Sequence, residues 1–160
     1  MSADRVAIAV GIVALALILG ALGFQYGAGM PPCEMCHWQR WPHINAAILG
    51  ILGGGLIAAG LLDKKYAGPF ALLTLALVAA SGAIGAYQAG IEWGFFPGPA
   101  ACTGPAVVLT GSLDLNHPVV RCDIAAWRLF GISLAGYNAA ISLATAVVGL
   151  LLLARRRGSN

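Results

Sequence analysis

Four stretches of this chain are long, apolar and free of charged side chains, and they constrain its fold more than any other feature. They cover residues 6–24, 44–62, 70–91 and 129–154. A helix of about 20 apolar residues crosses the hydrocarbon core of a bilayer. Membrane strands are shorter and alternate in polarity, whereas these runs are continuous and rich in Ala, Leu, Ile and Gly. We therefore predict an all-α fold, an integral membrane four-helix bundle that forms a single domain over residues 1–160.

The composition agrees with a membrane protein and excludes other classes. Hydrophobic residues make up 59% of the chain and charged residues 9%, against about a quarter charged in soluble domains. The net charge of +3 is spread along the chain, so we predict the lipid bilayer and no nucleic acid as a partner. The first run is longer than the apolar core of a signal peptide and lacks a small-x-small cleavage site, so we expect a retained helix.

The basic residues between the runs predict the orientation, because Lys and Arg are in excess on the cytoplasmic side. One side would carry Arg5, Lys64, Lys65, Arg155, Arg156 and Arg157, and the other Arg40, Arg121 and Arg128. This distribution places both termini in the cytoplasm and turns the loops at 25–43 and 92–128 outward. We also expect part of the second loop, near 107–115, to lie along the membrane surface.

All four cysteines fall in the two outward loops. They are Cys33, Cys36, Cys102 and Cys122. Disulfides persist outside the bacterial cytoplasm, so this location indicates disulfide chemistry. Three pairings of four cysteines are possible, and the spacing does not choose among them.

The C-x-x-C of Cys33 and Cys36 follows Pro31 and Pro32, and proline is well tolerated at the start of a helix. We predict that both cysteines lie in the first turn, where the helix dipole favours a thiolate. Helical spacing brings Arg40 onto the same face. Its guanidinium would favour the thiolate further and could donate a hydrogen bond to the oxygen of an apolar electron acceptor.

Other interpretations of these residues stay open. A C-x-x-C is half of a zinc site, although the other two cysteines do not repeat its short spacing. A disulfide between Cys102 and Cys122 could simply brace the long loop. Trp38 and Trp41 are typical of an aromatic belt at the membrane interface, and we expect His37 and His43 to be interfacial as well.

Three segments together resemble the disulfide bond formation protein B (DsbB) family, in a form associated with alphaproteobacteria. They read FQYGAGMPPCEMCHWQRWPH, GAYQAGIEWGFFPGPAACTGP and RCDIAAWRLFGISLAGYNAAIS, and the resemblance covers most of residues 24–142. Its specific features are C-x-x-C-x-x-x-R after the first run, two cysteines between the third and fourth runs, and a Trp five residues after the last cysteine.

The resemblance implies an enzyme of the bacterial inner membrane, a thiol:quinone oxidoreductase that reoxidises a periplasmic thioredoxin-fold oxidase, DsbA, with ubiquinone or menaquinone as acceptor. By position, it implies that Cys102 forms the mixed disulfide with the partner and that Cys122 is its loop mate. Cys33 would take electrons from Cys122. Cys36 would meet the quinone as a thiolate, and Arg40 would hold the quinone oxygen.

The sequence departs from the resemblance near the outer end of the third run. Many relatives are expected to have a His close to the quinone there, whereas this chain has Gln88, followed by Glu92. Gln88 is therefore a weak candidate for quinone binding, because an amide donates a hydrogen bond but does not relay a proton. Glu92 is a weak alternative, because an outward carboxylate at a helix end is more often just solvated. Tyr137 and Asn138 in the fourth run are expected to bond across the bundle or to line a quinone pocket.

Gly50 and Gly54 have the G-x-x-x-G spacing that lets membrane helices approach closely, and we predict a packing role for both. Two other functions remain alternatives. One is a vitamin K epoxide reductase-like enzyme, in which the C-x-x-C follows the loop pair instead of preceding it. The other is a non-enzymatic membrane module whose loops are stapled by disulfides or hold zinc.

Overall fold

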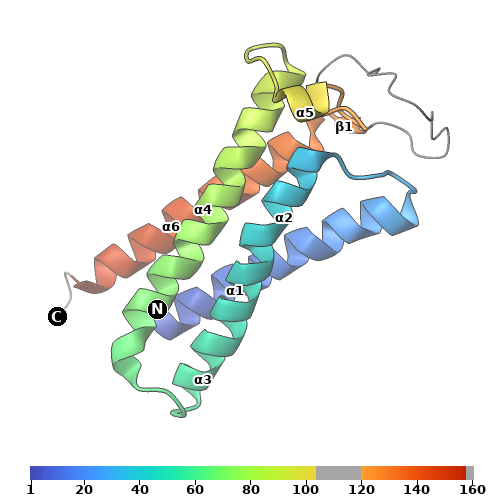
Figure 1. The fold of residues 1–160 in the computed structure, drawn as a ribbon. Helices are drawn as coiled ribbons and strands as arrows, with labels where there is room; N and C mark the ends of the chain where they lie inside the picture. Colours follow the sequence, from blue (N-terminus) through green and yellow to red (C-terminus); the bar gives the residue numbers. More distant parts are fainter. Residues whose placement is uncertain (104–119, 158–160) are drawn as a thin grey trace.

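A computed structural model describes residues 1–103 and 120–157 of the chain, and these residues are almost entirely helical (Figure 1). The predicted surface segment at 107–115 lies outside them. The elements in chain order are α1 (Ala3–Leu22), a π-helical turn (Gly23–Gly27), α2 (Glu34–Ala47), a second π-helical turn (Ile48–Gly53), α3 (Gly54–Ala58), a short 3₁₀ helix (Lys64–Tyr66), α4 (Ala67–Glu92), α5 (Ala100–Thr103), β1 (Arg128–Leu129), β2 (Ile132–Ser133) and α6 (Leu134–Arg157).

The described residues contain four helices long and apolar enough to cross a membrane, which confirms the predicted bundle. The second span runs without a break from Glu34 through α2 and α3 to Ala58, so its predicted start at Ile44 was wrong. Residues 34–43 are polar and aromatic, and an apolar run therefore does not mark them. They are helical because Cys33 caps the helix and because several of their side chains are buried against α4 and α6.

The fourth helix starts at Leu134, later than the predicted start at residue 129. Residues 128–133 form a small antiparallel hairpin in which Arg128 pairs with Ser133 and Leu129 with Ile132. Phe130 and Gly131 make the turn, with φ values of 50° and 80°. Positive φ at both central residues is what a two-residue hairpin turn of the right twist requires. The apolar residues before α6 therefore belong to the hairpin.

The residues packed at the two ends of the bundle differ in kind. At one end, the starts of α1 and α4 pack against Ile57 of α3 and Leu153 of α6 in a purely apolar cluster. At the other end lie α5, the hairpin and the start of α2 (Figure 1). A separate cluster there contains Cys33, Cys102 and Cys122. The fold therefore gathers cysteines from both predicted loops at the end of the bundle opposite the chain termini.

Glycine allows α1 to touch the second span backbone to backbone. A Cβ added at Gly50 would lie 2.9 Å from the Cα of Gly11 and closer still to the carbonyl oxygen of Ala7. A Cβ at Gly54 would lie 3.0 Å from the carbonyl oxygen of Asp4. Backbone atoms cannot move aside as a flexible side chain can. The predicted packing role of Gly50 and Gly54 is therefore confirmed.

We predict that Gly50→Ala lowers the free energy of unfolding by about 1–3 kcal/mol, because the added methyl group forces α1 away from the second span. Gly55→Ala is the matched control, since a Cβ at Gly55 meets no atom within 4 Å. Thermal unfolding of the purified protein in detergent measures both variants. Equal loss of stability in the two would contradict the close approach at Gly50.

Candidate redox site

The first cysteine pair lies at the start of α2, as predicted. Cys33 is the N-cap residue, with extended φ and ψ of −78° and 169°, and its Sγ accepts a hydrogen bond from the backbone N–H of Cys36 at 3.1 Å. The two residues form a disulfide with a Cα–Cα distance of 5.1 Å. Pro31 and Pro32 precede the cap in non-helical backbone. An N-terminal position supplies unsatisfied backbone donors and a favourable dipole for a sulfur anion.

The second pair joins α5 to the segment before the hairpin. Cys102 and Cys122 form a disulfide with a Cα–Cα distance of 5.4 Å, and the N–H of Cys122 donates to the carbonyl oxygen of Cys102 at 3.0 Å. Of the three possible pairings, the structure has 33 with 36 and 102 with 122. Cys122 is fully buried, whereas Cys102 keeps 7% of its surface exposed.

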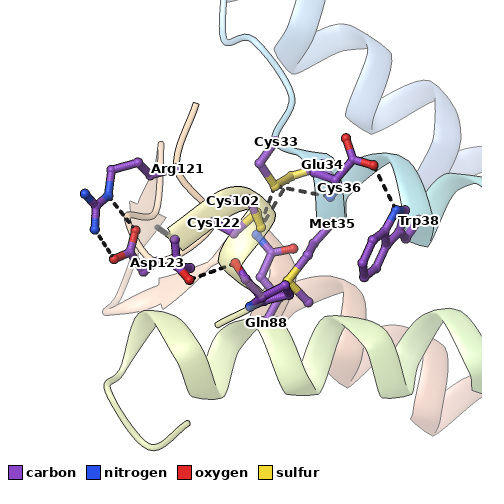
Figure 2. The surroundings of a disulfide bond; sticks show 12 residues. Cys33, Glu34, Met35, Cys36, Trp38, Gln88, Cys102, Arg121, Cys122 and Asp123 are labelled. Carbon is purple, nitrogen blue, oxygen red and sulfur yellow. Dashed lines mark hydrogen bonds and ion pairs between the residues drawn. A yellow bond between two sulfur atoms is a disulfide. The ribbon is translucent and has the colours of Figure 1, made fainter. Parts of the chain in front are cut away.

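The two disulfides belong to one buried cluster together with Met35 and Ile91 (Figure 2). The cluster brings together chain segments that the sequence separates widely. The loops that carry the two pairs therefore already approach each other, which exchange between two disulfides requires. All four sulfurs are engaged in disulfides, and the described residues contain no group of three or more His, Cys, Asp or Glu arranged to hold a metal ion.

A cavity of about 370 Å³ lies beside the first disulfide, between α1, α2 and α6. Cys36 lines it, and Cys33, Cys102 and Cys122 do not. Most of the lining is apolar, and Arg40 is the charged side chain among the lining residues. Arg40 Nη1 donates to Gln25 Oε1 at 2.6 Å, which fixes the guanidinium near the end of α1. Cys36 and Arg40 thus share this cavity, in agreement with their predicted common helix face.

Aromatic side chains close one part of this cavity. The Trp127 ring lies 5.1 Å from that of Phe24 and 6.2 Å from that of Tyr137, measured between centroids, and all three residues line the cavity. Trp127 is the residue five positions after the last cysteine, a feature of the sequence to which we assigned no role. By contrast, Trp38 and Trp41 are exposed on the outside of α2, where an aromatic belt requires them.

The floor of the cavity is polar. Gln39, His43 and Asn138 line it and are joined by hydrogen bonds across α2 and α6. His43 Nε2 lies 2.8 Å from Asn138 Oδ1, and Ser142 Oγ donates to the same oxygen at 3.0 Å. His43 is only 3% exposed and lies inside the bundle, whereas His37 is exposed, and their positions at the membrane interface stay a prediction. The helical continuation of α2 past residue 34 carries His43 into the bundle.

Two backbone carbonyls fix the direction of these hydrogen bonds. Gln39 Nε2 donates to the carbonyl oxygen of Met35 at 3.3 Å, and Asn138 Nδ2 donates to that of Ser81 at 3.3 Å. A carbonyl only accepts, so the amide nitrogens must point toward it. The oxygen of Asn138 then faces His43, whose Nε2 must carry the proton. Nδ1 of His43 is buried and has no hydrogen-bond partner in the described parts of the chain.

Gln88 and Glu92 lie on the other side of the first disulfide from this cavity. Both line a second, small cavity of about 40 Å³ together with Cys33 and Cys36. The Gln88 amide nitrogen contacts Glu92 Oε1 at 3.2 Å. Neither Gln88 nor Glu92 lines the large cavity beside Arg40. Their suggested part in quinone binding stays a prediction; the structure places the Gln88 amide at the sulfurs and Glu92 beside Gln88.

An ion pair lies next to the second disulfide on the solvent side. Arg121 donates to both carboxylate oxygens of Asp123, at 2.9 and 2.6 Å. These hydrogen bonds lower the pKa of Asp123 below its ordinary value, so the carboxylate stays charged at neutral pH. The pair flanks Cys122 and leaves the segment with balanced charge.

Comparisons with known proteins agree with this architecture. The family model described as disulfide bond formation protein DsbB matches residues 3–152. Disulfide bond formation protein B of Aromatoleum aromaticum is 27% identical over 155 residues, which cover 89% of this chain and 90% of the relative. The protein of the same name from a Polaromonas species is 26% identical over 94% of this chain and 90% of the relative. No solved structure matches the chain significantly.

We predict that Asn138→Leu lowers the free energy of unfolding by about 1–3 kcal/mol, because it leaves Gln39 Oε1 and the Nε2–H of His43 without their partner in an apolar bundle. Asn45→Leu is the matched control, since Asn45 is exposed on α2. Thermal unfolding in detergent compares the two. A smaller effect at Asn138 than at Asn45 would contradict the importance of the polar floor.

Proposed function

The chain belongs to the disulfide bond formation protein B family, and from this premise we propose that it is a thiol:quinone oxidoreductase. It would reoxidise a periplasmic, thioredoxin-fold, DsbA-like oxidase and pass the electrons to ubiquinone or menaquinone in the bacterial inner membrane. The observation that carries the proposal is the position of Cys36. Its disulfide touches the second cysteine pair on one side and an apolar cavity on the other.

The cavity fits the head group of a quinone in size and chemistry. Its volume of about 370 Å³ falls within the range of small-molecule sites, and its lining is apolar with a few polar groups. Arg40 can donate a hydrogen bond to a carbonyl oxygen. The lone pair on Nδ1 of His43 has no partner in the described residues and can accept a hydrogen bond from a hydroxyl group. When bound, a quinone would accept two electrons and two protons.

In the proposed relay, electrons pass from the partner to the Cys102–Cys122 pair and then to the Cys33–Cys36 pair. The partner's dithiol reduces the Cys102–Cys122 disulfide and becomes oxidised. The Cys122 thiolate then attacks Cys33, whose bond to Cys36 breaks, and Cys36 takes the electron pair. Cys102 next attacks Cys122, which restores the loop disulfide and leaves Cys33 and Cys36 as a dithiol. Re-forming the Cys33–Cys36 disulfide releases two electrons and two protons to the acceptor.

The difference in exposure between Cys102 and Cys122 supports Cys102 as the cysteine that the partner's thiolate attacks first. Cys102 retains some exposed surface and Cys122 has none, so Cys102 is the better target for an incoming thiolate. Cys122 lies in the same buried cluster as Cys33, which suits exchange between them. The cysteine-rich end would face the periplasm, and both termini would be cytoplasmic, in accordance with the distribution of basic residues.

We predict that Cys36→Ser abolishes quinone reduction with either a reduced DsbA-like protein or dithiothreitol as the electron donor. Cys102→Ser should abolish the reaction with the protein donor but retain it with dithiothreitol, because a small thiol can reduce the first disulfide directly. Quinone absorbance in detergent measures the rates, and thermal unfolding checks the fold. Unchanged rates in both variants would contradict the relay, and a wild-type protein that reduces no quinone would favour a disulfide-stapled module without enzymatic activity.

We predict that Arg40→Met raises the apparent KM for quinone about tenfold, because one charge-assisted hydrogen bond is lost while an unbranched apolar stem is kept. Arg121→Met is the matched control, since Arg121 is paired with Asp123 and does not line the large cavity. Steady-state kinetics at saturating protein donor separate KM from kcat. An unaltered KM in Arg40→Met would remove Arg40 from the site.

A further inference from the structure

Gln88 directs its amide nitrogen at the first disulfide from inside the bundle. The nitrogen lies 3.3 Å from Cys33 Sγ and 3.8 Å from Cys36 Sγ, distances at which sulfur accepts hydrogen bonds. The side chain is 4% exposed, so water does not compete for these contacts. Figure 2 shows Gln88 reaching from α4 toward the cysteines. A donor in this position is not required to hold a disulfide, whose sulfur atoms are weak acceptors.

The orientation of this amide is imposed from the far side. Gln39 Nε2 donates to Gln88 Oε1 at 2.6 Å, and Gln39 is itself held by its bond to the carbonyl of Met35. Asn138 completes the arrangement by donating to Gln39 Oε1 at 2.7 Å. The oxygen of Gln88 is therefore occupied, and its N–H groups are left for Glu92 and the sulfurs. Rotation of the Gln88 amide would place its nitrogen against the donating nitrogen of Gln39 and its oxygen against Glu92 Oε1.

We propose that Gln88 is a catalytic residue that stabilises the thiolate form of the inner cysteine pair, and that Gln39 acts as the positioning residue that keeps its N–H groups toward the sulfurs. The proposal rests on the proposed function, because it requires that Cys33 and Cys36 leave the disulfide state. Gln88 then acts on the sulfurs and not on the quinone. This agrees with its absence from the lining of the large cavity.

The chemistry needs a donor at this point. When a thiolate attacks Cys33, one S–S bond forms and the Cys33–Cys36 bond breaks, and the electron pair leaves with Cys36. When Cys33 is later released, it takes the electron pair instead. A sulfur that becomes negative in a buried site requires hydrogen-bond donors. Cys33 then has the N–H of Cys36 and of Gln88, and Cys36 has that of Gln88.

Among the described residues, no charged side chain donates a hydrogen bond to either sulfur of the pair, whereas Gln88 does. Glu92 and Arg121 line the small cavity next to the disulfide, and Arg128 donates to the backbone oxygen of Glu92 at 3.1 Å. Arg121 is engaged by Asp123. Glu92 is acidic and repels a thiolate when ionised. Arg40 approaches from the large cavity on the other face.

The test uses the full-length chain with Cys36, Cys102 and Cys122 replaced by Ser, so that Cys33 is the remaining thiol. The rate of alkylation of Cys33 by iodoacetamide is followed against pH in detergent. Gln88→Leu should slow alkylation at pH 7 about tenfold and move the midpoint of the profile upward by about one pH unit. Leu has a similar size but no N–H group, so the thiolate loses a hydrogen-bond donor. Gln88→His, which restores an N–H donor, should recover much of the rate.

Gln39→Glu tests the orientation without changing Gln88. A carboxylate at position 39 only accepts, so the Gln88 amide should turn its nitrogen toward it and its oxygen toward the sulfurs. Alkylation should slow as in Gln88→Leu, whereas Asn45→Leu on the outside of α2 should leave it unchanged. Gln39→Met is an uncharged substitution that also removes the hydrogen bond holding the Gln88 amide. Thermal unfolding identifies any variant that has lost its fold.

An unchanged profile in folded Gln88→Leu overturns the proposal. A changed profile in Gln88→Leu with none in Gln39→Glu and Gln39→Met overturns the positioning role of Gln39. A raised KM for quinone with unchanged alkylation would make Gln88 a quinone ligand, which also overturns it. Alkylation needs neither quinone nor a protein partner. Failure of the proposed function would therefore appear in the quinone assay alone and stays distinguishable from failure here.

Discussion

The side chain of Gln39 bonds to α4 and α6 at once, and the architecture of the redox end depends on it. Its nitrogen donates to Gln88, and its oxygen accepts from Asn138. Its backbone oxygen also accepts from Ser81 on α4. Inside a membrane, polar groups find no water, so each must be paired within the protein. Gln39 therefore fixes the rotation of α2 about its axis, and with it the faces on which Cys33 and Cys36 lie.

This rotation separates the surroundings of two bonded sulfur atoms. Cys33 is buried among the second disulfide, Met35 and Ile91. Cys36 reaches the cavity that Arg40 and His43 also line. The second disulfide, where the proposed protein donor would react, and the cavity proposed for the acceptor thus lie on opposite sides of the Cys33–Cys36 disulfide. The two sulfurs differ in surroundings because Cys33 is the N-cap residue with extended backbone, whereas Cys36 lies within the first turn of α2.

The sequence predicted the parts of this structure that depend on continuous apolar runs and on residue type. It predicted four spans, the close approach at Gly50 and Gly54, the position of the C-x-x-C at a helix start, and the shared face of Cys36 and Arg40. The pairing of the cysteines required the fold, because the cluster that joins the loops is formed by tertiary contacts.

The polar residues of the second span explain the main errors. Between residues 34 and 43 the chain contains Gln, His, Arg and Trp, so the segment was placed in the outward loop with a helix start at the C-x-x-C, and the membrane span was predicted to begin only at residue 44. In the structure this segment is helical, and Gln39 and His43 are buried. Hydropathy cannot identify a helix whose polar side chains bond to each other inside a bundle. Helical spacing from Cys36 to Arg40 was predicted, and its continuation to His43 was the available signal that this helix runs without a break into the second span. The family resemblance suggested Gln88 as a quinone ligand, whereas in the structure its amide nitrogen contacts Cys33 Sγ.

The donors at the inner pair also bear on the order of events in the proposed relay. Cys33 has two N–H donors within hydrogen-bond distance, and Cys36 has one, at 3.8 Å. In a free dithiol the negative charge is therefore best held at Cys33, away from the cavity. When Cys33 is bound to Cys122 it is a neutral disulfide sulfur, so Cys36 is the sulfur of the pair that can be a thiolate. The negative charge then lies on Cys36, beside the cavity, and this state forms only after the partner has reduced the Cys102–Cys122 disulfide. The equilibrium constant of thiol–disulfide exchange with a strongly oxidising partner is close to one. A reactive Cys36 thiolate that is present only while Cys33 is bound to Cys122 favours electron transfer to the membrane acceptor over return of the electrons to the partner.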